Sequence, residues 1–278
     1  MVLTDELFER GKNQKEICSV IDDDYVLLKK KMPCTDADLE KYINTINKAK
    51  SEGVNIASVI DYKLIDGTTE TFQNGKTSYT TGVFLEERAK GSQMPEYHGP
   101  AKSSNDLWNY SKVVKEYIEE FEKKASVDQN VYDKFLQDYL RLNELGITPD
   151  PKPSNFFFDE KDGFTIIDVI DMKNNTNQFL VRYIFSGVFG YGLPVIYLPD
   201  ENYYSFTTFS LYKRYEEACR LVFEKVINSA KKYGIETKYL MEDLKSASDK
   251  CFANTLVVRD SNLNIFIENY DFESKKER

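Results

Sequence analysis

The sequence predicts an α+β protein whose first 90 residues form mainly β-strands and whose remaining residues are mostly helical. Apolar residues alternate with polar ones in short runs of the N-terminal part, whereas they recur at helical spacing in longer runs after it. The composition indicates a well-packed globular chain, because 41% of the 278 residues are hydrophobic and 14% are aromatic, with only 13 Gly and 8 Pro. This length allows one large domain or two modest lobes.

The N-terminal part is expected to contain strands on both sides of one helix. The segment "EICSVIDDDYVLLKKKM" predicts two strands around the turn "IDDD". In "TDADLEKYINTINKAKSEG", Thr35 is the expected N-cap, Asp38 follows three residues later, and Gly53 ends the helix. "NIASVIDYKLIDGTTETFQ" and "TSYTTGVFLEERAKG" predict further strands joined by Gly-containing turns. The apolar face of the helix comprises Leu39, Tyr42, Ile43, Ile46 and Ala49.

The rest of the chain carries helical spacing with one hairpin within it. "NDLWNYSKVVKEYIEEFEKKAS" and "VYDKFLQDYLRLNELG" predict two helices, the second with Gly146 at its end. "NFFF" and "FTIID" predict two apolar strands, because the turn "DEKDG" between them has Gly163 where a positive φ is tolerated. A long amphipathic helix is expected from Thr207 to Tyr233, closed by Gly234.

Composition and charge exclude several classes of partner and site. A formal charge of −9 and a pI near 5.0 argue against a nucleic-acid partner, since phosphate binding needs clustered Lys and Arg. The four cysteines are widely spaced, which indicates free thiols, and a single histidine, His98, leaves almost no material for Ser-His-Asp or Cys-His catalysis. The N-terminus "MVLTDELFERGKNQKE" lacks the apolar core of a signal peptide, and no apolar run approaches the length of a membrane span. We therefore expect a cytoplasmic protein without a membrane span.

One loop carries the strongest functional signal. "DPKPSNFFF" places Asp150, Lys152 and Asn155 between a predicted helix and a predicted hairpin, and Asp168 ends the second hairpin strand. An isolated D-x-K-x-x-N has a plainer interpretation, a solvated loop in which Asp and Asn cap turns. The order of helix, D-x-K-x-x-N, hairpin and Asp resembles the catalytic loop and metal-binding aspartate of the protein kinase-like superfamily, which includes Ser/Thr protein kinases and aminoglycoside phosphotransferases. The chain is similar to a divergent, bacterial-type member of this superfamily.

The resemblance implies a bilobal fold and covers roughly residues 8–172. A small antiparallel N-lobe sheet with one helix would occupy residues 1–86, and a hinge would occupy residues 87–92. Residues 93–278 would form a larger, mostly helical C-lobe that contains the catalytic loop 150–155. The last hundred residues would be a divergent part of this helical lobe.

The resemblance also implies an enzyme that uses ATP and Mg²⁺. Asp150 would orient and deprotonate the attacking hydroxyl, and Lys152 would steady the transferred γ-phosphate. Asn155 and Asp168 would hold Mg²⁺ against the nucleotide phosphates, since both are hard oxygen ligands. Asp171 is a rival metal ligand.

A lysine that holds the α- and β-phosphates is a second requirement of the family, and a glutamate on the next helix normally pairs with it. In "VLLKKKM", strand alternation places Lys30 among apolar neighbours, with Lys29 and Lys31 on the opposite and more solvated face. Lys30 is therefore the preferred candidate and Lys29 the alternative. Glu40, one turn before Ile43, is the expected partner of Lys30.

"GVFLEERAKG" resembles the fifth strand and hinge of the family, where backbone groups meet adenine. Glu87 would supply the main-chain acceptor and Ala89 the donor, and Gly91 would let the chain turn into the helical lobe. An edge strand that ends in a charged loop has the same pattern, so this segment alone does not identify a hinge.

The sequence departs from the family pattern at several positions, and these departures bear on whether the protein is an active enzyme. The phosphate-covering loop should be G-x-G-x-x-G, but "RGKNQKEI" retains only Gly11. Thr148 and Pro149 stand where His and Arg normally precede the catalytic aspartate, and a Val-Ile pair follows Asp168 in place of Phe-Gly. An A-P-E-like end to an activation segment is also missing from the sequence.

Two functions follow from the resemblance. The first is transfer of the γ-phosphate of ATP to a hydroxyl acceptor. Lys152 favours a protein Ser/Thr, whereas the missing activation segment favours a small molecule. The second is a pseudokinase that binds a nucleotide or a partner protein without transfer, which the degraded glycine loop favours. A non-kinase scaffold is the third interpretation.

Overall fold

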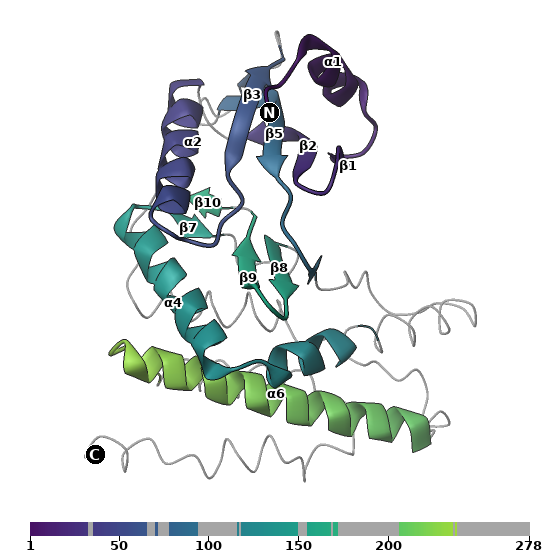
Figure 1. Cartoon of the computed structure of the whole chain (residues 1–278), viewed down its shortest axis with the longest axis vertical. Helices are drawn as coiled ribbons and strands as arrows, with labels where there is room; N and C mark the ends of the chain where they lie inside the picture. Colours follow the sequence, from purple (N-terminus) through teal and green to yellow (C-terminus); the bar gives the residue numbers. More distant parts are fainter. Residues whose placement is uncertain are drawn as a thin grey trace.

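The protein has a mixed α and β structure with antiparallel sheets (Figure 1). In Figure 1 the main sheet and its two flanking helices lie at one end, and two further labelled helices lie at the other. The computed structural model describes residues 1–32, 36–65, 70–71, 78–93, 116, 118–149, 155–167, 169–171, 206–235 and 237.

The main sheet has five strands in the order β1-β2-β5-β3, with β4 paired to β5, and every pairing is antiparallel. The predicted turn between the first two strands is confirmed, since the Asp22 carboxylate accepts hydrogen bonds from the backbone of Asp24 and Tyr25, both at 2.9 Å. The register of β2 on β5 places Lys30 opposite Gly82. The strands are β1 (Cys18–Val20), β2 (Tyr25–Met32), β3 (Val59–Leu64), β4 (Glu70–Thr71) and β5 (Ser78–Glu87).

The predicted helix between the strands is confirmed as α2 (Asp36–Ser51), and it covers one face of this sheet. Leu39 and Ile43 pack with Phe84 of β5 in one buried cluster, because their spacing places them on one side of the helix. Gly53, with φ 87°, follows the helix end. The expected N-cap, Thr35, lies outside the described residues.

Helix α1 (Asp5–Asn13) covers the opposite face and was not predicted. Thr4 caps it by accepting a hydrogen bond from the Leu7 backbone at 3.3 Å. Phe8 is buried in a cluster with Leu27, Val83 and Leu85 of the sheet.

Gly11 lies where α1 presses closest to the sheet. A Cβ atom at this position would sit 2.5 Å from Val83 Cγ1 and 3.0 Å from Leu27 Cδ2. The one glycine that resembled a phosphate-covering loop therefore serves the packing of a helix on the sheet.

The largest core joins the remaining helices to a hairpin. Strands β8 (Phe156–Asp159) and β9 (Gly163–Ile166) form the predicted hairpin, with Gly163 at φ 77°, although the second strand ends at Ile166 rather than at Asp168. Phe156, Phe158 and Phe164 pack there against α4 (Gln129–Glu144) and α6 (Phe206–Lys232), and residues 118–126 are also helical. Two short pairings complete the description: β6 (Ser92–Gln93) with β8, and β7 (Thr148–Pro149) with β10 (Val169–Asp171).

The segment after α2 ties the sheet to the hairpin. Ala57 donates to the Ile166 carbonyl at 2.9 Å, and Ile166 donates to the Asn55 carbonyl at 3.0 Å. The Asn55 side chain also donates to the Phe164 carbonyl at 2.8 Å, and its backbone donates to Asp138 Oδ2 at 3.2 Å. These bonds fix the lower end of the sheet against the helical part.

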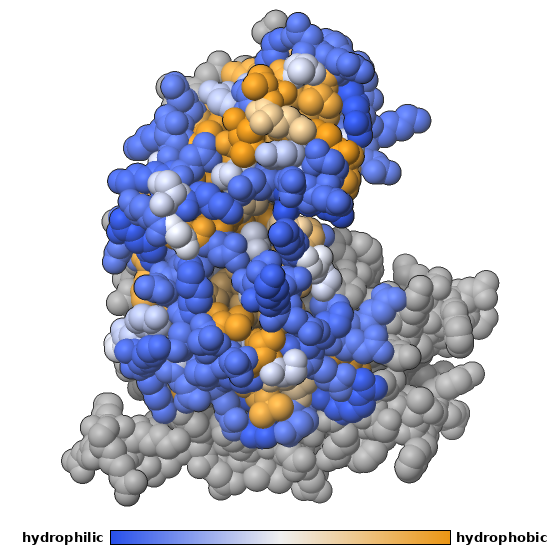
Figure 2. Space-filling model, in the orientation of Figure 1, coloured by the Kyte–Doolittle hydropathy of each residue, from blue (hydrophilic) through white to orange (hydrophobic). Residues whose placement is uncertain are grey.

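Apolar surface gathers over the sheet in the view of Figure 2, whereas hydrophilic residues cover much of the rest of the described surface in this view. The helices of the described residues include none that is long and apolar enough to cross a membrane. The exposed large hydrophobic side chains of the described part are Met1, Val2, Ile17, Val20 and Ile60.

Candidate functional site

Lys30 occupies a partly enclosed position on the α2 side of the sheet. Alternation along β2 and the register with β5 place Lys30, Phe84 and Glu86 on the same face. Lys30 Nζ lies 2.8 Å from Glu86 Oε1, and the side chains are 21% and 5% exposed. The same amine lies 6.0 Å from the centre of the Phe84 ring. A buried carboxylate at this distance orients the amine of the lysine through a charge-assisted hydrogen bond.

The neighbouring lysines have other surroundings. Lys29 Nζ donates to the Lys12 carbonyl at 2.7 Å, which satisfies the C-terminal end of α1. Lys31 is exposed. Lys29 therefore supports helix α1 on the far face, and Lys30 is the lysine of this strand that faces α2.

Glu86 was not predicted, and the expected carboxylate, Glu40, has a different environment. Glu40 is exposed on α2, whose apolar face turns Leu39 towards the sheet. The pairing of Glu40 with Lys30 stays a prediction. Only the register of β2 on β5 could have identified Glu86 as the partner of Lys30, because the two residues lie far apart in the sequence.

The predicted hinge leaves the sheet through Glu87. Its backbone N–H donates to the Ser58 carbonyl at 3.0 Å, and its carboxylate pairs with Lys50 Nζ at 2.8 Å. Burial raises the pKa of Glu87, but hydrogen bonds from Lys50 and Ser58 outweigh it, so the pKa lies below its usual value. Ala89 follows in a half-buried position. The roles of Glu87 and Ala89 towards adenine stay predictions.

Gly91 makes the turn that was expected at the end of the hinge. It has φ 89°, and a Cβ atom at this position would lie 2.0 Å from the Phe158 carbonyl oxygen. The next residues, Ser92 and Gln93, pair with Phe158 and Phe157. The glycine therefore brings the hinge directly onto the strand that follows the predicted catalytic loop.

Asn155 is the one member of the D-x-K-x-x-N motif among the described residues. It lies just before β8, and its carbonyl accepts a hydrogen bond from the Ile167 backbone at 3.0 Å. Its side-chain Nδ2 is buried and has no hydrogen-bond partner among the described residues. Asp150, Lys152 and Asp168 lie outside the described residues. Asp171 lies in β10, opposite Thr148, and only its backbone is described.

The chemistry of Asn155, the described residue among the predicted magnesium ligands, is compatible with a magnesium site. The atom of Asn155 with unmet hydrogen-bonding capacity is Nδ2, a donor that suits an acceptor such as a phosphate oxygen, and the amide Oδ1 is the atom that could bind Mg²⁺. The described residues contain no group of three or more His, Cys, Asp or Glu arranged to hold a metal. Magnesium needs only one or two protein oxygens when phosphates supply the rest.

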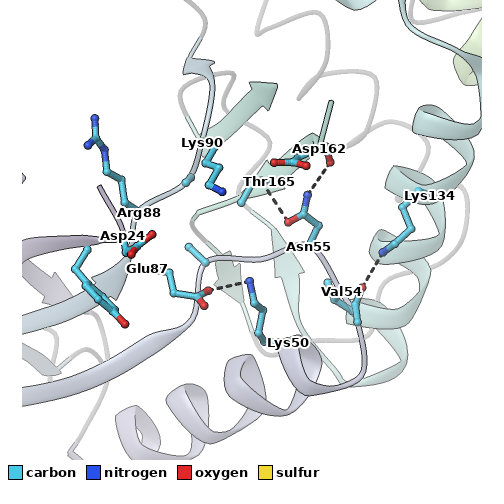
Figure 3. A pocket seen from close by; sticks show the side chains of 14 residues that line it. Asp24, Lys50, Val54, Asn55, Glu87, Arg88, Lys90, Lys134, Asp162 and Thr165 are labelled. Carbon is cyan, nitrogen blue, oxygen red and sulfur yellow. Dashed lines mark hydrogen bonds and ion pairs between the residues drawn. The ribbon is translucent and has the colours of Figure 1, made fainter. Parts of the chain in front are cut away.

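A cavity of about 640 Å³ lies beside the predicted hinge, residues 87–92 (Figure 3). The hinge, the segment after α2, α4 and the hairpin all contribute to it, and Lys50 and Glu87 point towards each other across it. Of the described residues with a predicted role, Glu87 and Ala89 line this cavity, whereas Lys30 and Asn155 do not. Its charged lining residues are Asp24, Lys50, Glu87, Arg88, Lys90, Lys134 and Asp162.

Comparison with known proteins adds no assignment. No protein-family model matches the chain, and no curated protein matches it significantly. The kinase-like resemblance therefore rests on the residues of the chain itself.

Proposed function

We propose that this protein is an ATP- and Mg²⁺-dependent phosphotransferase of bilobal, protein kinase-like fold that acts in the cytoplasm. The main support is the position of Lys30, whose amine is held by a buried carboxylate on the helix-covered face of the sheet. This is the environment that a phosphate-holding lysine needs. The acceptor is a hydroxyl of a protein Ser/Thr or of a small molecule.

In this proposal Asp150 accepts the proton of the acceptor hydroxyl while the acceptor oxygen bonds to the γ-phosphorus. The bond between that phosphorus and the β,γ-bridging oxygen breaks, and ADP leaves. Lys152 steadies the transferred phosphoryl group, and Lys30 holds the α- and β-phosphates. Asn155 and Asp168 hold Mg²⁺, which neutralises phosphate charge when bound.

The second candidate is a pseudokinase, and the position of Gly11 favours it. Residues 5–13 form α1 on the outer face of the sheet, and β1 is only three residues long. The described residues before β2 therefore contain no glycine-rich hairpin that would cover phosphates. Such a protein would bind a nucleotide or a partner without phosphate transfer.

Nucleotide-dependent thermal stabilisation, compared between Lys30→Met and Lys29→Met, tests the site. We expect ATP and ADP with Mg²⁺ to raise the melting temperature, since a ligand at 100 times its Kd stabilises by about 2.7 kcal/mol. Lys29→Met should keep this shift and Lys30→Met should lose most of it. A shift that survives Lys30→Met but not Lys29→Met would reverse the assignment of the lysines. No shift with any nucleotide would contradict the phosphotransferase and would leave a partner-binding pseudokinase or a non-kinase scaffold.

A further inference from the structure

We propose that Glu86 of β5, rather than a glutamate of helix α2, is the positioning residue that orients Lys30 towards the nucleotide phosphates. This inference rests on the proposed function, because it names the carboxylate on which the phosphate-holding lysine depends. Its basis is the contact of Lys30 Nζ with Glu86 Oε1 at 2.8 Å on the α2-covered face of the sheet.

The sheet itself builds this pair. Strands β2 and β5 are paired over eight residues, from Tyr25 opposite Glu87 to Met32 opposite Thr80, and Val26 is the direct neighbour of Glu86. Lys30 reaches back along the face towards the hinge end, over Phe84. With only 5% of the Glu86 side chain exposed, water competes little for its carboxylate.

The other nearby carboxylates have different surroundings. Glu87 is taken by Lys50 at 2.8 Å and by the Ser58 backbone at 3.1 Å. Glu40 is exposed on α2. Of these three described carboxylates, Glu86 is the one that combines burial with a short distance to the Lys30 amine.

A consequence concerns regulation. In protein kinases the lysine depends on a helix glutamate, so movement of that helix controls activity. A partner on β5 moves with β2, because hydrogen bonds join the two strands. The lysine of this protein would therefore stay oriented whatever the position of α2.

The test uses the full chain with Glu86→Gln, Glu40→Gln, Lys30→Met and the double variant Glu86→Gln/Lys30→Met. We expect Glu86→Gln to weaken ATP binding by at least about tenfold, the loss of one charge-assisted hydrogen bond, while adenosine binding is unchanged. Glu40→Gln should bind ATP like the wild type. In the Lys30→Met background, Glu86→Gln should have no further effect on ATP affinity, because it acts through Lys30.

Acylation of Lys30 by an amine-reactive ester, followed by mass spectrometry, tests the pair without a nucleotide. Lys30 should react slowly in the wild type and in Glu40→Gln, and faster in Glu86→Gln. If the wild type binds no nucleotide, the proposed function fails, and the acylation rates still show whether Glu86 holds Lys30. If ATP binds and Glu40→Gln rather than Glu86→Gln weakens it, the positioning role of Glu86 is wrong while the function stands. If Glu86→Gln does not fold, Glu86→Asp replaces it, because aspartate keeps the charge on a shorter side chain. An ATP affinity and a Lys30 acylation rate equal to those of the wild type in Glu86→Asp would count against the inference.

Discussion

Replacing Lys124 with methionine should stabilise the protein, and more strongly at neutral than at alkaline pH. The Lys124 side chain belongs to the helical residues 118–126, and the residue is only 2% exposed. Burial lowers the pKa of its amine from 10.5 to about 7, although the charge of Glu120 acts in the opposite direction. The Glu120 carboxylate itself binds Ser92 Oγ and Lys123 Nζ, both at 2.6 Å.

The pKa of Lys124 sets the magnitude and the sign. A pKa of about 7 in the folded protein, against 10.5 in the unfolded chain, corresponds to about 5 kcal/mol of destabilisation once the buried amine is charged. Cation–π contacts offset about 1 kcal/mol of this destabilisation, because Lys124 Nζ lies 5.8 Å from the centre of the Phe121 ring and 6.0 Å from that of Phe158. Because the unfolded chain binds more protons between these two values, stability rises as pH increases from about 7 towards 10.5.

Urea unfolding at a series of pH values measures this effect. Wild type should gain stability from about pH 7 to about pH 9.5, and Lys124→Met should show a flatter profile with a higher midpoint at about pH 7. Lys123→Met is the matched control, because the hydrogen bond from Lys123 to Glu120 raises the pKa of that amine above 10.5. A wild-type profile that is flat or falling over this range, or a slope that persists in Lys124→Met, would refute the reasoning.

Two further predictions concern the hinge. Gly91→Ala should lower the free energy of unfolding by about 3 kcal/mol or more, because the added Cβ would lie 2.0 Å from the Phe158 carbonyl oxygen. Gly53→Ala is the control: Gly53 also has a positive φ of 87°, but no atom lies within 4 Å of its Cβ position, so this variant should cost only about 1 kcal/mol. Equal losses in urea unfolding would argue against this close approach. Because the pKa of Glu87 is depressed in the folded state, its contribution is present above the unfolded value of 4.5 and is lost as pH falls through the folded value. Glu87→Gln should therefore lose less stability on acidification than wild type, by at most about 1 kcal/mol given its partial exposure, and identical acid unfolding curves would contradict this.

Periodicity and turn chemistry predicted much of the secondary structure. The apolar face of α2, the hairpin turn at Gly163 and the long helix α6 all follow from local patterns that need no knowledge of distant contacts. Helix α1 had a local signal too, with Thr4 as N-cap and acidic residues in the first turn. A glycine in a helix of this kind resembles part of a phosphate loop, whereas the close approach of Val83 is what requires a small residue at Gly11.

The site depended more on long-range pairing. The alternation of β2 was enough to place Lys30 among apolar neighbours, and the structure shows that this face of the strand meets α2. Its partner could not be predicted, because the register between β2 and β5 is set by pairing across the intervening helix and strands. The pairing of β7 with β10 has a different obstacle, since strands of two and three residues leave no period to detect in the sequence.

The most direct test of the phosphotransferase proposal is release of ADP from ATP by the full chain, compared between wild type and Asp150→Asn with Mg²⁺ or EDTA. We expect Mg²⁺-dependent release by wild type and a fall of at least about 100-fold in Asp150→Asn, since general-base catalysis contributes about that much. Nucleotide-dependent thermal stabilisation should persist in the variant. Full activity in Asp150→Asn would contradict the role of Asp150, and stabilisation by ATP without ADP release in either protein would identify a pseudokinase.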